Sequence, residues 1–172
     1  TTSRWNIGEA FFALDPPDRN HHNQAHVFTL ASRWTLDCLR AVVAAVESQH
    51  DLLRARYTPE ARGWSQAYGE GSRPLPVGVM DASALEPSDV ASWLDAAATE
   101  VQRSLDIQAG PLYQVRLIHL RERDLLLFVI HHLVVDGVSW RILADDLNRL
   151  FHQYTRNEPL ELGRKTSSFR QW

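Results

Sequence analysis

Two histidines, an aspartate and a glycine stand close together in the segment HHLVVDG at residues 131–137. The segment follows LLLFVI, an uninterrupted apolar run of the kind found in strands that are covered on both faces. Histidine titrates near neutral pH, so an imidazole can take up and return a proton in a reaction. Because α/β folds often place functional groups where a central strand ends, this segment could carry acid–base chemistry.

The spacing of these residues does not favour a metal site. Adjacent strand residues point to opposite faces, so His131 and His132 cannot both bind one ion. His132 and Asp136 could chelate an ion only across a helical turn, which Gly137 disfavours. No third ligand follows at a usual spacing, and we therefore predict that the segment binds no metal.

A structural interpretation explains the same residues and stays open at this point. Both histidines could be hydrogen-bonded core residues, while Asp136 caps a helix that begins near residue 138. Gly137 suits a tight turn or a plain helix start equally well. A second pair, His21 and His22, follows a proline-rich loop. We expect this pair to lie at an exposed loop end, with a place at the site as the alternative.

Composition narrows the class of protein. The 172 residues, 44% of them apolar, suffice for one compact domain or one lobe of a larger one. A formal charge of −3 without a basic run predicts neither nucleic acid nor an anionic membrane as partner. Cys38 is the only cysteine, which fits a cytoplasmic setting. The sequence shows no signal peptide, and its ends suggest a piece cut from a longer polypeptide.

Hydrophobic periodicity predicts the elements that must position the histidines. Helical spacing falls at 6–14, 36–49, 88–105 and 138–154, and strand patterns fall at 23–33, 52–57, 64–68, 77–81, 112–120 and 125–131. Thr35 is placed to cap the second helix. The inward side of the last helix should carry Trp140, Leu143, Leu147, Leu150 and Tyr154. The order predicts an α/β fold, a two-layer sandwich of helices on a mixed β-sheet.

Four motifs, in order, resemble the condensation-domain superfamily of nonribosomal peptide synthetases. HHLVVDG resembles its HHxxxDG motif, and the longer HHLVVDGVSWRILADDL is most similar to the epimerization-domain branch. HHNQAHVFTL (21–30) resembles the HHxNQ stretch, HDLLRARY (50–57) the HxxLRxxF motif, and TSSFRQW (166–172) the end of the first lobe. The resemblance implies a chloramphenicol-acetyltransferase-like lobe, with residues 1–172 as the N-terminal lobe of a two-lobed domain whose second lobe is absent.

Three departures from the family pattern stand out. The opening helix of the family usually carries a PIQxWF-like motif, and in the corresponding NIGEAFF the residues Asn6, Ile7 and Gly8 replace its first part. Gln49 stands where peptide-bond-forming members usually have an arginine before HxxLR, which favours the epimerization branch. The second-lobe EGHGRE-like motif, which supplies a glutamate to the active site, does not occur in this sequence.

The resemblance also implies roles for individual residues. His132 would face the channel between the lobes as catalytic acid or base, or as hydrogen-bond donor to an enolate oxygen. His131 would face the other way as a structural residue. Asp136 would pair with Arg54 and, with Gly137, hold the turn after the strand. The alternative is that Arg54 is solvated and Asp136 only caps a helix.

The function implied is inversion of the α-carbon of an aminoacyl or peptidyl thioester. The partners would be the C-terminal lobe and a peptidyl carrier domain that holds the substrate on its 4′-phosphopantetheine, with no cofactor bound directly. The single lobe should be inactive alone. The alternatives are a condensation domain that forms a peptide bond, a non-catalytic docking lobe and an acyltransferase that uses coenzyme A.

Overall fold

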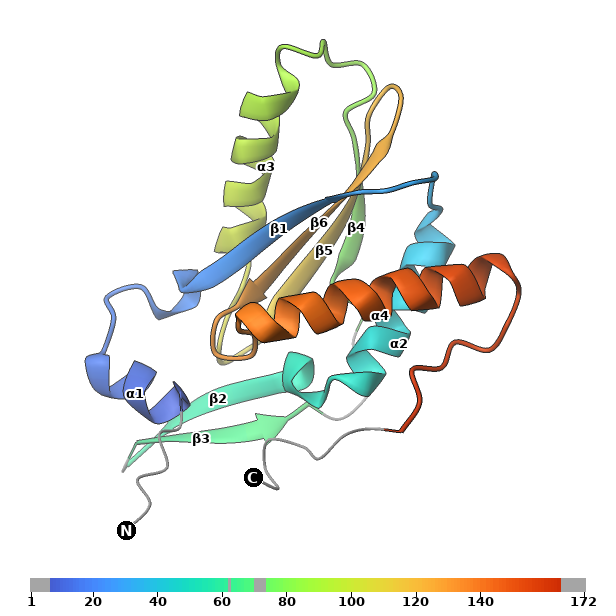
Figure 1. Cartoon of the computed structure of the whole chain (residues 1–172). Helices are drawn as coiled ribbons and strands as arrows, with labels where there is room; N and C mark the ends of the chain where they lie inside the picture. Colours follow the sequence, from blue (N-terminus) through green and yellow to red (C-terminus); the bar gives the residue numbers. More distant parts are fainter. Residues whose placement is uncertain (1–6, 62, 70–73, 165–172) are drawn as a thin grey trace.

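The computed structural model describes residues 7–61, 63–69 and 74–164 of the chain. In chain order the elements are α1 (Ile7–Leu14), the 3₁₀ helix η1 (Arg19–His21), β1 (Asn23–Thr29), α2 (Leu36–Gln49), the 3₁₀ helix η2 (Asp51–Arg54), β2 (Ala55–Glu60), β3 (Gly63–Tyr68), β4 (Val77–Asp81), α3 (Val90–Arg103), β5 (Tyr113–His119), β6 (Asp124–His131) and α4 (Gly137–Thr155). Figure 1 shows their arrangement.

A four-stranded mixed sheet with the order β1-β6-β5-β4 forms the frame of the fold. β6 runs antiparallel to both of its neighbours, β1 and β5, whereas β4 runs parallel to β5. Every residue of β6 is buried, as its continuous apolar sequence predicts for a covered central strand. β2 and β3, which fall on the strand patterns predicted at 52–57 and 64–68, pair antiparallel in a separate two-stranded sheet. The predicted α/β class, with helices packed on a mixed sheet, is confirmed.

Helices cover both faces of the sheet, so the fold has one layer more than the two-layer sandwich expected. Leu126, Phe128 and Ile130 of β6 pack in the core that α2 and α4 cover. The alternate residues Leu125, Leu127 and Val129 pack in a second core with residues of α3. This division follows from the two-residue period of a strand. Figure 1 shows α3 on the opposite side of the sheet from α2 and α4.

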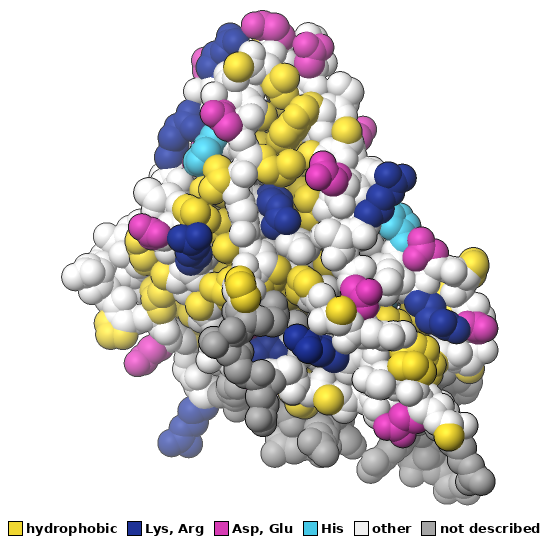
Figure 2. Space-filling model, turned by 180° about the vertical axis from the view of Figure 1, so that it is seen from behind, with side chains coloured by type: hydrophobic (Ala, Val, Ile, Leu, Met, Phe, Trp, Pro, Cys, Tyr) yellow, Lys and Arg dark blue, Asp and Glu magenta, His cyan; other side chains and the backbone are white. Residues whose placement is uncertain are grey.

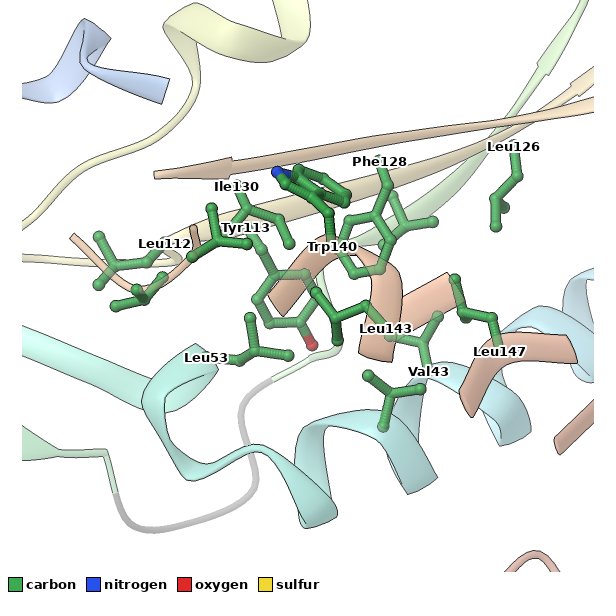
Figure 3. Close-up of a cluster of buried hydrophobic side chains, with 14 of the residues drawn as sticks. Val43, Leu53, Leu112, Tyr113, Leu126, Phe128, Ile130, Trp140, Leu143 and Leu147 are labelled. Atoms are coloured by element: carbon green, nitrogen blue, oxygen red, sulfur yellow. The ribbon is translucent and has the colours of Figure 1, made fainter. Parts of the chain in front are cut away.

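The first core joins β5 and β6 to the inner faces of α2 and α4. In Figure 3, Trp140, Leu143 and Leu147 of α4 lie around Phe128 of β6. Each fully buried side chain of this size contributes about 1.5–3 kcal/mol to stability. Figure 2 shows that apolar side chains also reach the surface on the rear face, among acidic and basic side chains.

Helix boundaries agree closely with the sequence patterns, and one cap was predicted correctly. α2 spans the predicted residues, and the Thr35 side chain accepts a hydrogen bond from the Cys38 backbone N–H. The prediction of Tyr154 as an inward residue was wrong, because the side chain is 37% exposed. Leu150 is the last buried residue of α4, so the final turn of the helix lies beyond the core.

Two segments differ from the predicted strands. Residues 52–54, predicted as the start of a strand, belong to the 3₁₀ helix η2, and this turn carries Leu53 into the core. Asp124, one residue before the strand predicted at 125–131, is the first residue of β6 and is 1% exposed. Its burial is possible because positive and polar groups surround the carboxylate.

The Asp124 carboxylate ties three segments together at one end of the sheet. One oxygen accepts a hydrogen bond from Nη1 of Arg33 at 2.8 Å and lies 2.9 Å from Nδ1 of His119. The other oxygen accepts from the Trp34 backbone N–H at 3.1 Å. Asp124 therefore links the segment after β1 to the ends of β5 and β6.

We expect Asp124→Asn to lower the free energy of unfolding by about 2–4 kcal/mol, because the amide cannot replace a charged acceptor of three hydrogen bonds. Urea titration of both proteins at pH 7 measures the difference. Asp145→Asn, at an exposed position on α4, is the matched control and should change little. Equal losses in the two variants would contradict a special role for Asp124.

Candidate active site at the ends of β1 and β6

Backbone pairing brings the two histidine pairs of the sequence together. Asn23 at the start of β1 lies opposite His131 at the end of β6. One residue further, the His132 N–H donates to the His22 carbonyl oxygen at 2.8 Å. Segments that are more than a hundred residues apart in sequence therefore meet at one corner of the sheet.

Three amide side chains anchor the chain around the start of β1. The Asn20 side-chain oxygen accepts from the Ile107 N–H at 3.0 Å, before the strand begins. Nδ2 of Asn23 donates to the Gln102 carbonyl oxygen at 3.3 Å, near the end of α3. On the other face, Oε1 of Gln24 accepts from the indole N–H of Trp140 at 2.6 Å. The start of β1 is thus held from both faces of the sheet.

His131 is a structural residue whose two ring nitrogens are both engaged. The side chain is buried, Nε2 donates to the Arg19 carbonyl oxygen at 2.7 Å, and Nδ1 accepts from the Leu133 N–H at 3.1 Å. Burial, the largest cause, lowers the pKa of His131 to about 4. The ring is therefore neutral near pH 7 and available for neither proton transfer nor ligand binding.

His132 is oriented differently and keeps one nitrogen open. It lies in the turn after β6 and is partly exposed, unlike His131. Its Nδ1 lies 3.0 Å from the Val135 carbonyl oxygen, which can only accept, so Nδ1 carries the proton. In the neutral ring Nε2 then holds a lone pair, and no hydrogen bond within the described residues uses it. This is the arrangement that a general base requires.

His21 and His22 are both exposed, as expected of a loop end, and His22 also lies against His132. The two rings stack with centroids 5.1 Å apart and planes 10° apart. Partial burial, and then the nearby charge of His132, lower the pKa of His22. No sequence signal marks this contact, because it depends on the register between β1 and β6.

Asp136 caps α4. Its carboxylate accepts hydrogen bonds from the Ser139 backbone N–H at 2.7 Å and from the Ser139 hydroxyl at 2.6 Å. These two hydrogen bonds are the largest causes of a lowered pKa for Asp136. Gly137 is the first residue of the helix, and a Cβ atom there would contact nothing within 4 Å. The cap fixes the end of the turn that begins with His132.

The expected ion pair between Arg54 and Asp136 was wrong. Arg54 pairs with Asp51, three residues earlier in η2, and the carboxylate of Asp136 accepts hydrogen bonds from Ser139. The HDLLR segment does reach α4, but through its histidine: Nε2 of His50 lies 2.7 Å from Oδ2 of Asp146. Local hydrogen bonds thus replace the long-range pair expected from the motif.

Trp140 is a core residue, as expected, and also connects α4 to β1. Its side chain is 6% exposed, and the His26 ring stacks on it with centroids 4.1 Å apart. Within residues 7–61, 63–69 and 74–164, no group of three or more His, Cys, Asp or Glu side chains is arranged to hold a metal ion. No helix in the same residues is long and apolar enough to span a membrane.

The model of the condensation domain family matches residues 8–172 of the chain. The chain belongs to the condensation domain family. This confirms the superfamily expected from the four motifs.

Relatives of this condensation-domain chain are peptide synthetases. It is 37% identical over 168 residues to a linear gramicidin synthase of Brevibacillus parabrevis, in a match that covers 96% of the chain and 3% of the synthase. It is 34% identical over 165 residues to bacitracin synthase 3 of Bacillus licheniformis, with 95% of the chain and 2% of that protein covered. The chain therefore spans only a small part of each of these two proteins.

Solved structures show the same fold. The epimerization domain from the third module of tyrocidine synthetase B has a TM-score of 0.89 and 31% identity, covering 97% of this chain and 37% of that chain. The starter condensation domain of rhizomide synthetase has a TM-score of 0.73 and 18% identity, covering 87% and 36%. At that lower identity the likeness concerns the fold alone.

We expect the stability of this condensation-domain chain to fall in mild acid because of His131. Between pH 6.5 and the folded pKa of about 4, the unfolded chain binds one proton more than the folded chain, so stability drops as the pH falls. The full effect is on the order of 3 kcal/mol. Urea titrations from pH 7 to pH 4 measure it. His131→Gln should reduce the change in the free energy of unfolding between pH 7 and pH 4. His152→Gln, at an exposed position, is the control and should leave that change as it is.

The cap on α4 gives a second test. Asp136→Ala should lower the free energy of unfolding by about 1 kcal/mol, while Asp136→Asn, which can still cap, should cost less. In a double-mutant cycle with Arg54→Ala, the losses should add to within about 0.5 kcal/mol, because the two side chains form no ion pair. A clear coupling energy between the two substitutions would contradict this and support an ion pair between Arg54 and Asp136.

Proposed function

We propose that residues 1–172 form the N-terminal lobe of a nonribosomal peptide synthetase epimerization domain, with His132 as its acid–base group. The observation that carries the proposal is the orientation of His132. The Val135 carbonyl oxygen holds the proton on Nδ1, which leaves Nε2 as a base at a partly exposed position. The likeness to the tyrocidine synthetase epimerization domain supports this choice of branch.

The substrate class is an aminoacyl or peptidyl thioester on the 4′-phosphopantetheine arm of a peptidyl carrier domain. The thioester acidifies the α-hydrogen. When the α C–H bond breaks, the proton passes to Nε2 of His132 and the electron pair spreads onto the thioester oxygen. Inversion requires that a proton return to the opposite face of the α-carbon. A group on the C-terminal lobe of the same domain, a glutamate in this family, would face that side.

The neighbouring residues hold His132 in place and do not react. His131 fixes the end of β6 through the Arg19 carbonyl and the Leu133 N–H. Asp136 and Gly137 begin α4 and so close the turn that contains Val135. Arg54 stabilises η2 through Asp51, away from the Asp136 cap. We assign His131, Asp136 and Gly137 to support of the site, and Arg54 to the local structure of η2.

A condensation domain that joins two carrier-bound substrates is the second candidate. The family model that matches the chain bears that name, and a starter condensation domain shares the fold. In that reaction the same open Nε2 of His132 would assist the attacking amine. The two candidates differ in product: one inverts a stereocentre, and the other forms a peptide bond.

The test uses the two-lobed domain and, separately, the 172-residue chain, each with an aminoacyl-loaded carrier domain in D₂O. We expect the two-lobed domain to exchange the α-hydrogen for deuterium and to produce the D isomer, and the chain alone to produce none. His132→Ala should lower the rate by 10²–10⁴-fold, the usual contribution of a general acid–base group. His152→Ala, on the exposed side of α4, is the control.

Three outcomes would overturn the proposal. Peptide-bond formation from two loaded carriers without α-exchange would favour the condensation domain. Carrier binding without either reaction would favour a docking lobe. Full turnover in the His132→Ala variant would remove His132 from the chemistry.

A further inference from the structure

Four rings, those of Phe11, His22, His131 and His132, gather where β1 and β6 meet, and His22 is the histidine among them without an assigned role. It stacks on His132, and its other ring contact at comparable distance is Phe11 of α1, with centroids 5.2 Å apart. Phe11 also meets the buried His131 edge-on at 5.7 Å. His22 therefore joins α1 to the turn that contains His132.

The hydrogen bonds of the three histidines separate their roles. His131 uses both ring nitrogens, and His132 uses Nδ1 only. Within the described residues, the side chain of His22 makes no hydrogen bond, although its backbone oxygen accepts from the His132 N–H. Its side chain therefore acts on His132 through the flat face of its ring.

The electrostatics of the cluster permit this stacking near neutral pH. Partial burial and the charge of His132 lower the pKa of His22, which disfavours a second positive charge beside His132. The other titratable ring that faces His22 is His131, 6.2 Å away, which burial keeps neutral as well. The surroundings of both neighbouring rings therefore disfavour a second positive charge next to His132.

We propose that His22 is a positioning residue that fixes the plane of the His132 imidazole and hence the direction of its open Nε2. One hydrogen bond from Nδ1 anchors one edge of the His132 ring but still allows it to tilt about that contact. A second ring stacked on its face, backed by Phe11, removes this freedom. This inference rests on the proposed role of His132, since an aligned base matters only if Nε2 reacts.

Two substitutions separate the stacking surface from the ring nitrogens of His22. His22→Phe keeps a flat ring and removes both nitrogens, whereas His22→Ala removes the ring. His21→Ala is the matched control, because the His21 side chain is exposed and, among the described residues, makes no ring contact. Thermal unfolding of each variant shows whether it is folded before the other measurements are made.

The first measurement needs no activity and uses the 172-residue chain itself. Nitrogen-15 NMR of the imidazoles reports the fraction of His132 in the Nδ1–H tautomer at neutral pH. We expect this fraction to fall in His22→Ala and to stay at the wild-type level in His22→Phe and His21→Ala. An unchanged fraction in His22→Ala overturns the inference. The NMR measurement does not depend on the reaction that the domain catalyses. Failure of the positioning role can therefore be distinguished from failure of the proposed epimerization.

The second measurement is kinetic and uses the two-lobed domain with a loaded carrier. Misalignment of a reacting group lowers kcat, so His22→Ala should lose about tenfold or more in kcat. KM should stay within about twofold, because ground-state binding is not altered. His22→Phe should restore kcat. If His22→Phe is as slow as His22→Ala, the nitrogens of His22 act themselves and the positioning role is wrong.

Discussion

The antiparallel pairing of β1 with β6 is the constraint on which the site depends. It sets Asn23 opposite His131 and brings the His22 carbonyl to the His132 N–H. Because side chains alternate along a strand, a slip of one residue would turn every β1 side chain to the other face. The Gln24–Trp140 hydrogen bond would then be lost together with the stacked rings. The polar anchors of β1 and the histidine cluster therefore specify one register together.

β6 carries this pairing through the middle of the molecule with polar residues at its two ends. Asp124 begins the strand and His131 ends it, and both are buried. A buried polar group is tolerated only when its hydrogen bonds are made, and both side chains meet this condition with partners from other segments. The apolar residues between them fill two cores, one on each face of the sheet. The strand is thus fixed lengthwise by hydrogen bonds and sideways by packing.

Local patterns in the sequence were reliable where local forces decide the structure. Apolar spacing and the Thr35 cap placed α2, and the continuous apolar run placed β6 in the centre of the sheet. The superfamily followed from four motifs and was confirmed. The prediction of an ion pair failed where a side chain had both a near and a distant partner available. Arg54 took Asp51 from its own turn, since a partner three residues away costs little entropy to reach.

The site shows the same division between local and long-range information. The segment HHLVVDG could be recognised as a functional candidate, and the separate environments of its two histidines followed from strand alternation. The stack of His22 on His132 could not be predicted, because neither segment contains information about the register of the other. The same holds for His50 and Asp146, which connect the end of α2 to α4.

β1 is an outer strand of its sheet, bonded along one side to β6 and having no other partner strand among the described residues. Backbone hydrogen bonds in such strands open more readily than those of inner strands, often without unfolding of the rest of the molecule. We therefore expect the order of the histidine cluster to follow local opening of β1 more closely than global unfolding. Amide hydrogen exchange along β1 would report that equilibrium directly. A contact that covers the free edge of β1 would make the strand open less often, and would so increase the order of His22 and His132 without contacting either side chain.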